Sequence, residues 1–270
     1  MYNILKRIYY KSFYNNILKE HYKTQQLYKN AIDIEMKGGA FTVEYNKHNI
    51  KFKKFIDNDI LRLYLSTPDE NTNCITILVD MANNIAYIEG ITSNSYDTCF
   101  SEPELNNGKT IMEITLKMLE KYKDKLKLNK ITLKDNSFIT CDMDTKIVLS
   151  DLSLLQHNET FYSRFGFIPS DMEEYKNYKY NKKILSETKV QKFNLSKVLD
   201  KWENKIDTKL KQSMLKHYNE HLNENIVYWF NLFSKKYMKK DCELFNYIIK
   251  SMYIKLELIR LNGISYVKKL

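Results

Sequence analysis

Glycine and proline are scarce in this chain of 270 residues, which contains only 6 Gly and 3 Pro. Disordered linkers and low-complexity tracts are commonly rich in these residues, so their scarcity argues against long segments of that kind. Long apolar runs are also lacking, because basic residues interrupt the apolar ones near the N-terminus: Lys6, Arg7, Lys11 and Lys19. No segment approaches the ~18 apolar residues of a membrane-spanning helix, and no signal peptide is legible. The sequence therefore predicts a soluble, intracellular protein that makes no membrane contact.

Cysteine is rare as well. The four cysteines, Cys74, Cys99, Cys141 and Cys242, are widely spaced and none belongs to a C-x-x-C pair. Cysteine pairs at that short spacing are typical of structural zinc sites, so we expect no zinc ribbon and no bound metal. Cysteines of proteins in a reducing compartment stay unpaired, and we therefore expect free thiols.

Aromatic residues and positive charge are abundant. The 21 Tyr, together with many Lys, Asn and Ile, are typical of an AT-rich genome such as that of a large DNA virus. The net charge is +10, and residues 186–270 alone contain 17 Lys or Arg against 9 Asp or Glu. A basic segment favours an acidic partner or nucleic acid, although a solvated helix face has the same composition.

Apolar periodicity predicts the elements of the first two thirds of the chain. Residues 3–36 read as a helix that Gly38-Gly39 would end. Alternating apolar residues predict five short strands, the last two forming an antiparallel hairpin: 41–45, 50–55, 60–65, 74–81 and 84–91. Then follow a helix, a strand, an ambiguous stretch and a second helix: 108–125, 130–134, 138–149 and 151–165. This order predicts an α/β fold with a mixed sheet and helices on both faces.

The charged run 173–183 looks like a boundary, and beyond it the pattern is helical throughout. Apolar stripes predict helices over 195–214, 226–237 and 244–259, the last beginning at an N-cap, Asp241, and stopping at Asn262-Gly263. We therefore expect an N-terminal helical segment, an α/β domain and a basic α-helical region: 1–37, 38–184 and 185–270.

A helix that breaks at Gly166 and turns into a short strand carries the clearest motif, Phe161-Tyr162-Ser163-Arg164-Phe165-Gly166-Phe167. This segment resembles the end of GNAT-type N-acetyltransferase domains, where a tyrosine on the last helix faces the sulfur of acetyl-CoA. The order of predicted elements over 41–170 is also similar to that of a GNAT domain. Three runs resemble those of GNAT-like proteins of large DNA viruses: Asp135-Asn136-Ser137, Leu149-Ser150-Asp151 and Glu159-Thr160-Phe161-Tyr162.

The resemblance implies acyl-CoA-dependent acetyl transfer to an unidentified amine on a small molecule or a protein. The family's phosphate loop, Gln/Arg-x-x-Gly-x-Gly/Ala, corresponds here to residues 105–110, of whose glycines only Gly108 is present. Asn107, Gly108, Lys109 and Thr110 are the expected phosphate-binding residues. An ordinary helix N-cap at Asn107 would explain the same residues.

The remaining site residues follow from the same resemblance. Tyr162 matches the family's tyrosine, a general acid, although a core aromatic would fit the pattern too. Glu89 lies on the strand that would flank the cofactor, and a carboxylate on a half-buried strand face can have a raised pKa and act as the base. Ile91 on that strand and Asn136 at the end of the next one would also line the cofactor. A solvated glutamate and a strand-end asparagine are the simpler interpretations.

Histidines offer a weaker signal. His217 and His221 are four residues apart, but the residue after the first is Tyr218 rather than the glutamate of a zinc protease helix, so a solvated helix face is expected. His157, near Tyr162 in the sequence, would be a proton relay only if it faced that tyrosine.

Lysines near the end of the second C-terminal helix provide the alternative function. Lys235, Lys236, Lys239 and Lys240 flank Tyr237 and could bind nucleic acid through phosphate contacts and stacking. Two functions therefore stay open: an N-acetyltransferase, or an inactive GNAT-like structural or interaction protein, such as a viral component, that binds protein or nucleic acid through its basic helices.

Overall fold

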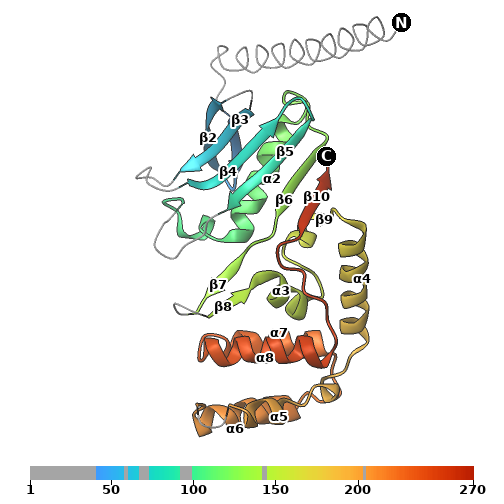
Figure 1. Cartoon of the computed structure of the whole chain (residues 1–270). Coiled ribbons are helices and arrows are strands. Elements are labelled where there is room, and N and C mark those ends of the chain that lie inside the picture. Colours follow the sequence, from blue (N-terminus) through green and yellow to red (C-terminus); the bar gives the residue numbers. More distant parts are fainter. Residues whose placement is uncertain (1–40, 58–59, 67–72, 92–98, 142–144, 203–204) are drawn as a thin grey trace, which may run out of the picture. The chain divides into compact units, whose positions relative to one another are not determined.

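The computed structural model describes residues 41–57, 60–66, 73–91, 99–141, 145–202 and 205–270 (Figure 1). The chain divides into two compact units, one ending at Leu133 and joined by Lys268–Leu270, the other comprising Lys134–Val267. This division lies elsewhere than the predicted boundaries after residues 37 and 184, which stay a prediction. The helix predicted over 3–36 lies outside the described residues.

Eight described strands form one sheet with the order β1-β2-β3-β4-β5-β6-β10-β9. The strands are β1 (Phe41–Tyr45), β2 (His48–Asp57), β3 (Ile60–Ser66), β4 (Asn73–Asp80), β5 (Ile85–Ile91), β6 (Lys130–Lys134), β9 (Ile168–Pro169) and β10 (Ser265–Lys269). Strands β1 to β5 form an antiparallel meander, whereas β5 and β6 pair in parallel. The predicted mixed α/β class is confirmed, and the first five predicted strands agree closely with the observed ones.

Helix α2 (Gly108–Tyr122) connects the parallel strands and crosses one face of the first unit's strands (Figure 1). Its apolar side chains recur at helical spacing, and Ile111, Ile114 and Met118 have no exposed surface. On β4, burial alternates instead with period two, at Ile75 and Ile77, as a strand requires. These two periods are why the sequence predicted both elements correctly.

The middle of the second unit differs from the prediction. The ambiguous stretch forms a hairpin of β7 (Phe138–Thr140) and β8 (Lys146–Val148). The helix predicted over 151–165 is present only in its first half, because α3 (Leu149–His157) ends at Asn158, which has a left-handed φ of 56°. Tyr162 instead begins a separate 3-10 turn, Tyr162–Phe165. Gly166 closes that turn with φ 84°, so the predicted glycine corner before β9 is present.

Helices dominate the rest of the second unit: α4 (Met172–Glu187), α5 (Leu195–Asp200), α6 (Thr208–Asn219), α7 (Ile226–Tyr237) and α8 (Cys242–Lys255). The charged run taken as a boundary is the solvated side of α4, which buries Tyr178, Asn181 and Leu185. Asp241 is the N-cap of α8, as predicted. The region is not helical throughout, since α8 stops at Lys255 and the chain ends in β10.

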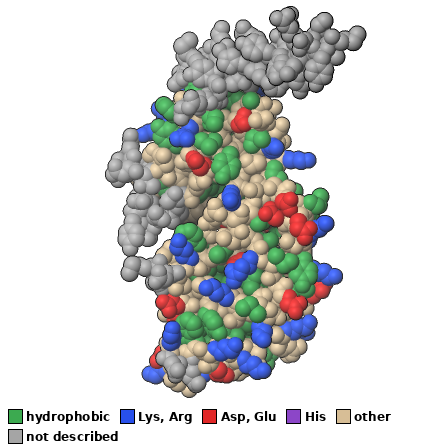
Figure 2. Space-filling view, in the orientation of Figure 1, with side chains coloured by type: hydrophobic (Ala, Val, Ile, Leu, Met, Phe, Trp, Pro, Cys, Tyr) green, Lys and Arg blue, Asp and Glu red, His purple; other side chains and the backbone are tan. Residues whose placement is uncertain are grey.

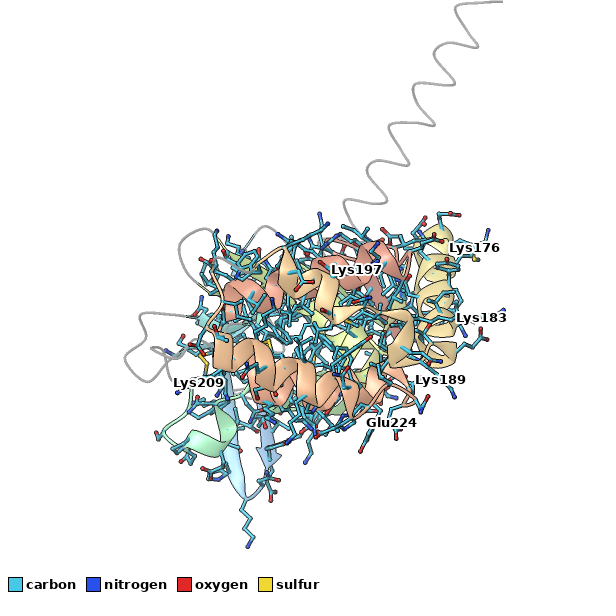
Figure 3. The ribbon with its side chains drawn as sticks, turned by 90° about the horizontal axis from the view of Figure 1, so that it is seen from below. Lys176, Lys183, Lys189, Lys197, Lys209 and Glu224 are labelled. Carbon is cyan, nitrogen blue, oxygen red and sulfur yellow. A yellow bond between two sulfur atoms is a disulfide. The ribbon has the colours of Figure 1, made fainter. Side chains whose placement is uncertain are left out.

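Aromatic side chains fill the core between these helices. Trp229, Phe230 and Phe233 of α7 have no exposed surface, and Phe230 stacks on Phe245 of α8 with ring centroids 5.4 Å apart. In Figure 3, side chains fill the space between the helices, while the labelled lysines of α4, α5 and α6 lie apart from one another around the outside. The amphipathic stripes therefore form the core, and the lysines remain at its surface.

All four cysteines are paired, so the prediction of free thiols is wrong. Cys74 bonds Cys99 in the first unit, and Cys141 bonds Cys242 in the second, with Cα atoms 5.7 and 5.5 Å apart. Those separations are typical of disulfides. The partners are 25 and 101 residues apart in sequence. Tertiary folding brings them together, so the local spacing of the cysteines does not predict these pairs.

None of the helices in the described residues is long and apolar enough to cross a membrane. The cellular compartment stays a prediction.

Candidate functional site

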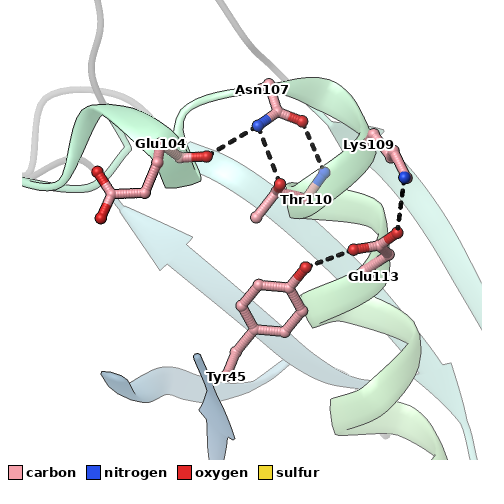
Figure 4. A network of polar contacts seen from close by, with 6 residues as sticks. All are labelled: Tyr45, Glu104, Asn107, Lys109, Thr110 and Glu113. Carbon is pink, nitrogen blue, oxygen red and sulfur yellow. Dashed lines mark hydrogen bonds and ion pairs between the residues drawn. The ribbon is translucent and has the colours of Figure 1, made fainter. Parts of the chain in front are cut away.

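The start of α2 is a closed N-cap (Figure 4). Asn107 Oδ1 accepts a hydrogen bond from Thr110 N at 2.9 Å, and Asn107 Nδ2 donates to Glu104 O and to Thr110 Oγ1 at 2.9 Å each. The simpler interpretation of Asn107 as an N-cap is therefore correct. Its side chain and the Thr110 amide are already satisfied, which leaves them less free to bind a phosphate.

Two backbone donors at this helix start have no acceptor among the described residues. Within the residues that the structure describes, neither the Gly108 nor the Lys109 backbone N–H makes a hydrogen bond. Both point out of the positive end of the helix dipole, where anions bind favourably. Two such donors at one helix start favour the binding of an anion.

The Lys109 side chain is partly neutralised. Its Nζ lies 3.7 Å from Glu113 Oε1, and the Tyr45 hydroxyl donates a short hydrogen bond to the other oxygen of Glu113 (Figure 4). That hydrogen bond raises the pKa of Tyr45. Lys109 is well exposed, so it can leave Glu113 at small cost.

Glu89 lies at an irregularity of β5. Its neighbours Gly90 and Ile88 pair with Thr76 and Ile77 of β4, so Glu89 is the extra residue of a β-bulge. Its side chain is exposed, which contradicts the half-buried face expected for a base. Ile91, the last residue of β5, is half-buried.

Tyr162 is half-buried in the second unit, and its hydroxyl contacts a polar side chain. The hydroxyl lies 3.4 Å from Ser137 Oγ, and Ser137 donates both its N–H, at 3.1 Å, and a short O–H bond to Asp135 Oδ1. Burial, followed by the charge of Asp135, raises the pKa of Tyr162 to about 12. Tyr162 is protonated at neutral pH, as a tyrosine with an ordinary pKa also is.

A second carboxyl group, Asp151 on α3, belongs to the same buried region. Asp151 is 1% exposed, and its Oδ2 accepts a hydrogen bond from Arg260 Nη1 at 2.6 Å. Burial raises its pKa to about 6, against the opposing charge of Arg260. The hydroxyls of Tyr253 and Tyr266 have no hydrogen-bond partner among the described residues. Burial, helped by the nearby carboxyl charges, raises the pKa of both tyrosines.

The predicted site residues are divided between the two units. Glu89, Ile91 and the 107–110 segment belong to the first, and Asn136 and Tyr162 to the second. Asn136 is exposed, and its Oδ1 is 3.7 Å from where a Cβ at Gly263 would stand. The sequence carried Asp135, Ser137 and Asp151 in the runs similar to viral GNAT-like proteins, but their role was not predicted.

The nucleic-acid cluster on α7 is incomplete. Tyr237 has no exposed surface and donates a hydrogen bond to Ser213 O at 2.8 Å, so the predicted stacking of a base on Tyr237 is wrong. Lys235, Lys236, Lys239 and Lys240 are exposed. In Figure 2, basic and acidic side chains are interspersed over the visible face of the second unit's helices, without one dominant basic patch.

The histidines do not form a site. His217 is buried, with its ring 4.5 Å from that of His221 and against Phe233, so the expected solvated face is wrong for this residue. The ring Nδ1 of His157 lies 3.4 Å from the side-chain Nδ2 of Asn231 on α7. In the described part of the chain, no three His, Cys, Asp or Glu side chains are grouped to hold a metal ion.

A cavity of about 480 Å³ in the first unit contains none of the predicted site residues. Its lining includes Lys47, His48 and Lys51 beside Glu102, with His48 Nδ1 3.8 Å from Glu102 Oε1. Asn106 lies between the cavity lining and α2 in the sequence. Its side-chain amide accepts a hydrogen bond from Phe100 N and donates one to Phe100 O.

Comparisons with known protein families, with curated proteins and with solved structures find no match for this chain. Function is therefore inferred from its own residues and from the resemblance described above.

Proposed function

We propose that the chain is an acyl-CoA-dependent N-acetyltransferase in which Tyr162 is the general acid. One observation carries this proposal: the Tyr162 hydroxyl lies 3.4 Å from Ser137 Oγ, and Ser137 is hydrogen-bonded to the buried carboxyl group of Asp135. A tyrosine with a purely structural role would place its hydroxyl against backbone groups or water. It would not be expected beside a side chain that is itself hydrogen-bonded to a carboxylate.

The first unit contributes a place for phosphate. Acetyl-CoA would supply the thioester that is cleaved and a diphosphate that needs backbone donors. The unpartnered N–H groups of Gly108 and Lys109 fit such an anion, and Lys109 can turn from Glu113 towards it. Parallel strands support the same location, because ligands of α/β sheets bind beyond the carboxyl ends of such strands. Here β5 pairs with β6 only as far as Ile88, and Glu89–Ile91 extend past that pairing.

The chemistry needs one proton donor and one acceptor. The amine nitrogen forms a bond to the acetyl carbon as the carbon–sulfur bond breaks. Tyr162 gives its proton to the departing sulfur and recovers one from water, while the proton lost by the amine passes to water. Glu89 lacks the burial that would make it a strong base. We therefore place the acid on Tyr162 and leave the base to solvent or to an exposed carboxylate.

Calorimetric titration with acetyl-CoA and with CoA tests the anion site. Gly108→Pro removes one unpartnered N–H at the first helical position, where proline is well tolerated, and Asn107 already has the extended φ of −136° and ψ of 149° that precede a proline. Gly108→Ala keeps the N–H and is the matched control. We expect weaker binding of both compounds in the proline variant only. Absence of saturable binding to the unaltered protein would reject the enzyme.

Turnover tests the acid. With a panel of polyamines and lysine peptides, Tyr162→Phe should lower thiol release by about 10²-fold or more with little change in acetyl-CoA affinity. Tyr180→Phe removes a hydroxyl from an exposed tyrosine of α4 and should leave turnover unchanged. Equal activity in the two variants would remove Tyr162 from the mechanism.

An interaction protein without cofactor is the second candidate. It is favoured by the closed cap of Asn107 and by the ion pair of Lys109, which leave few donors for a phosphate. Changing Lys235, Lys236, Lys239 and Lys240 to Ala should then weaken nucleic-acid binding and flatten its salt dependence. Lys176 and Lys183 of α4, placed elsewhere on the surface in Figure 3, are the control positions.

A further inference from the structure

Tyr162, Ser137 and Asp135 form a chain of polar groups inside the second unit. Asp135 has no exposed surface, and its Oδ2 has no hydrogen-bond partner among the described residues. Leaving a carboxyl oxygen buried and unpaired is costly, and an apolar side chain would avoid that cost. Folding stability alone therefore does not explain a carboxyl group at position 135.

Hydrogen-bond directions in this chain are fixed by the number of protons. Asp135 Oδ1 accepts from both the N–H and the hydroxyl of Ser137. The Ser137 hydroxyl has a single proton, which is committed to Asp135, so only its lone pairs face Tyr162. When Asp135 is ionised, Tyr162 is therefore the donor of the 3.4 Å contact to Ser137 Oγ.

The aromatic neighbours of Tyr162 hold this geometry. Its ring lies 5.6 Å from that of Tyr266 and 6.4 Å from that of Phe167, measured between centroids. Such packing limits rotation of the ring, so the hydroxyl stays beside Ser137. A tyrosinate at this place would face oxygen lone pairs and, behind them, a carboxylate in a poorly solvated environment.

We propose that Asp135, acting through Ser137, orients the Tyr162 hydroxyl and disfavours its tyrosinate form. Asp135 is thus a positioning residue, since it touches no substrate. The long contact to Ser137 leaves the Tyr162 proton available for transfer once a stronger acceptor arrives. The catalytic value of this arrangement rests on the proposed function, whereas the coupling between Asp135 and Tyr162 does not.

The coupling can be measured without any cofactor. Tyrosine labelled with ¹³C at Cζ reports ionisation by NMR, and the Tyr162 signal is identified by its loss in Tyr162→Phe. Asp135→Asn keeps the acceptor oxygen for Ser137 and removes only the charge, so it should bring the pKa of Tyr162 down by about 1. Glu187→Gln removes an exposed charge from α4 and should leave the Tyr162 titration unchanged.

Ser137→Ala separates the two possible directions of the hydrogen bond. If Ser137 donated to a tyrosinate, its loss would raise the pKa of Tyr162; because it only accepts, we expect no rise. An unchanged Tyr162 titration in Asp135→Asn, or a rise in Ser137→Ala, overturns the proposal. The second variant still decides the matter if Asp135→Asn fails to fold.

The activity assay distinguishes this proposal from the proposed function. In an active enzyme, Asp135→Asn should shift the alkaline fall of turnover to lower pH, because Tyr162 loses its proton earlier. A lowered Tyr162 pKa in a protein that binds no acetyl-CoA would uphold the coupling and reject the acetyltransferase. An active enzyme whose Tyr162 titration is unchanged in Asp135→Asn would uphold the acetyltransferase and reject the coupling.

Discussion

Asp151 places a titratable group where water is almost absent. Its side chain is 1% exposed, one oxygen contacts Arg260, and the other, Oδ1, has no hydrogen-bond partner among the described residues. Burial penalises the charged form more than the half-exposed Arg260 favours it, and the pKa accordingly rises to about 6. The folded protein thus binds a proton more tightly at this carboxyl than the unfolded chain does.

This difference predicts how stability changes with pH. An aspartate whose pKa is raised in the folded state contributes fully below its unfolded pKa, near 4, and that contribution is lost as pH rises to about 6. The loss amounts to roughly 3 kcal/mol of unfolding free energy. Denaturant unfolding of the unaltered protein and of Asp151→Asn, measured at pH 4 to 7, should therefore differ in slope over this window.

Other carboxyl groups titrate over the same range, so the comparison between variants carries the prediction. Asn cannot ionise, and Asp151→Asn should gain stability relative to the unaltered protein as pH rises from about 4 to about 6. Glu187→Gln, at an exposed position of α4, should follow the unaltered protein throughout. If the Asn variant kept the same pH dependence as the unaltered protein, the pKa of Asp151 would have to be ordinary.

Single residues of the site could be selected from sequence only where a local motif marks them. Asn107 stands before an apolar helix pattern, and Tyr162 stands four residues before a glycine corner. The bond between Ser137 and Tyr162 joins residues 25 apart, and Arg260 reaches Asp151 from 109 residues away. Such contacts arise from tertiary folding, and no local sequence pattern predicts them.

Elements with one clean period were predicted correctly. The β1–β5 meander alternates with period two, and α2 and α7 bury one stripe at helical spacing. Errors occur where a single backbone conformation interrupts an otherwise helical pattern, as at Asn158, or where buried residues are spaced irregularly. The stripe predicted over 244–259 extends beyond α8, which ends at Lys255: Leu256 is still buried there, but Ile259 is exposed.

The end of α3 depends on Asn158, whose φ of 56° few side chains adopt without strain. Asn158→Ala should lower the unfolding free energy by about 1 kcal/mol, whereas Asn158→Gly should be neutral or slightly stabilising. Thermal or denaturant unfolding would measure both. If Asn158→Ala were as stable as the Gly variant, a helix continuing to Phe165 would be the better description, and Tyr162 would lie on it.

At the scale of the whole molecule, each compact unit contains its own disulfide. Cys74–Cys99 closes a loop between partners 25 residues apart, and Cys141–Cys242 one between partners 101 residues apart. Loop-closure entropy gives about 3.5 kcal/mol for the first and about 4.7 kcal/mol for the second. Disulfides persist in oxidising surroundings, so alkylation of the denatured protein without reductant should label no cysteine.

The two tryptophans make the units distinguishable, because Trp202 and Trp229 both belong to the second unit. Replacing Cys141 and Cys242 by Ala should shift the unfolding transition seen by tryptophan fluorescence. Replacing Cys74 and Cys99 by Ala should shift only the transition seen by circular dichroism, which reports both units. Equal fluorescence shifts in the two variants would mean that the units unfold together, and the division at Leu133 would then not describe independent folding. If alkylation labelled thiols in the unreduced protein, the cysteines would be free, as the sequence predicts.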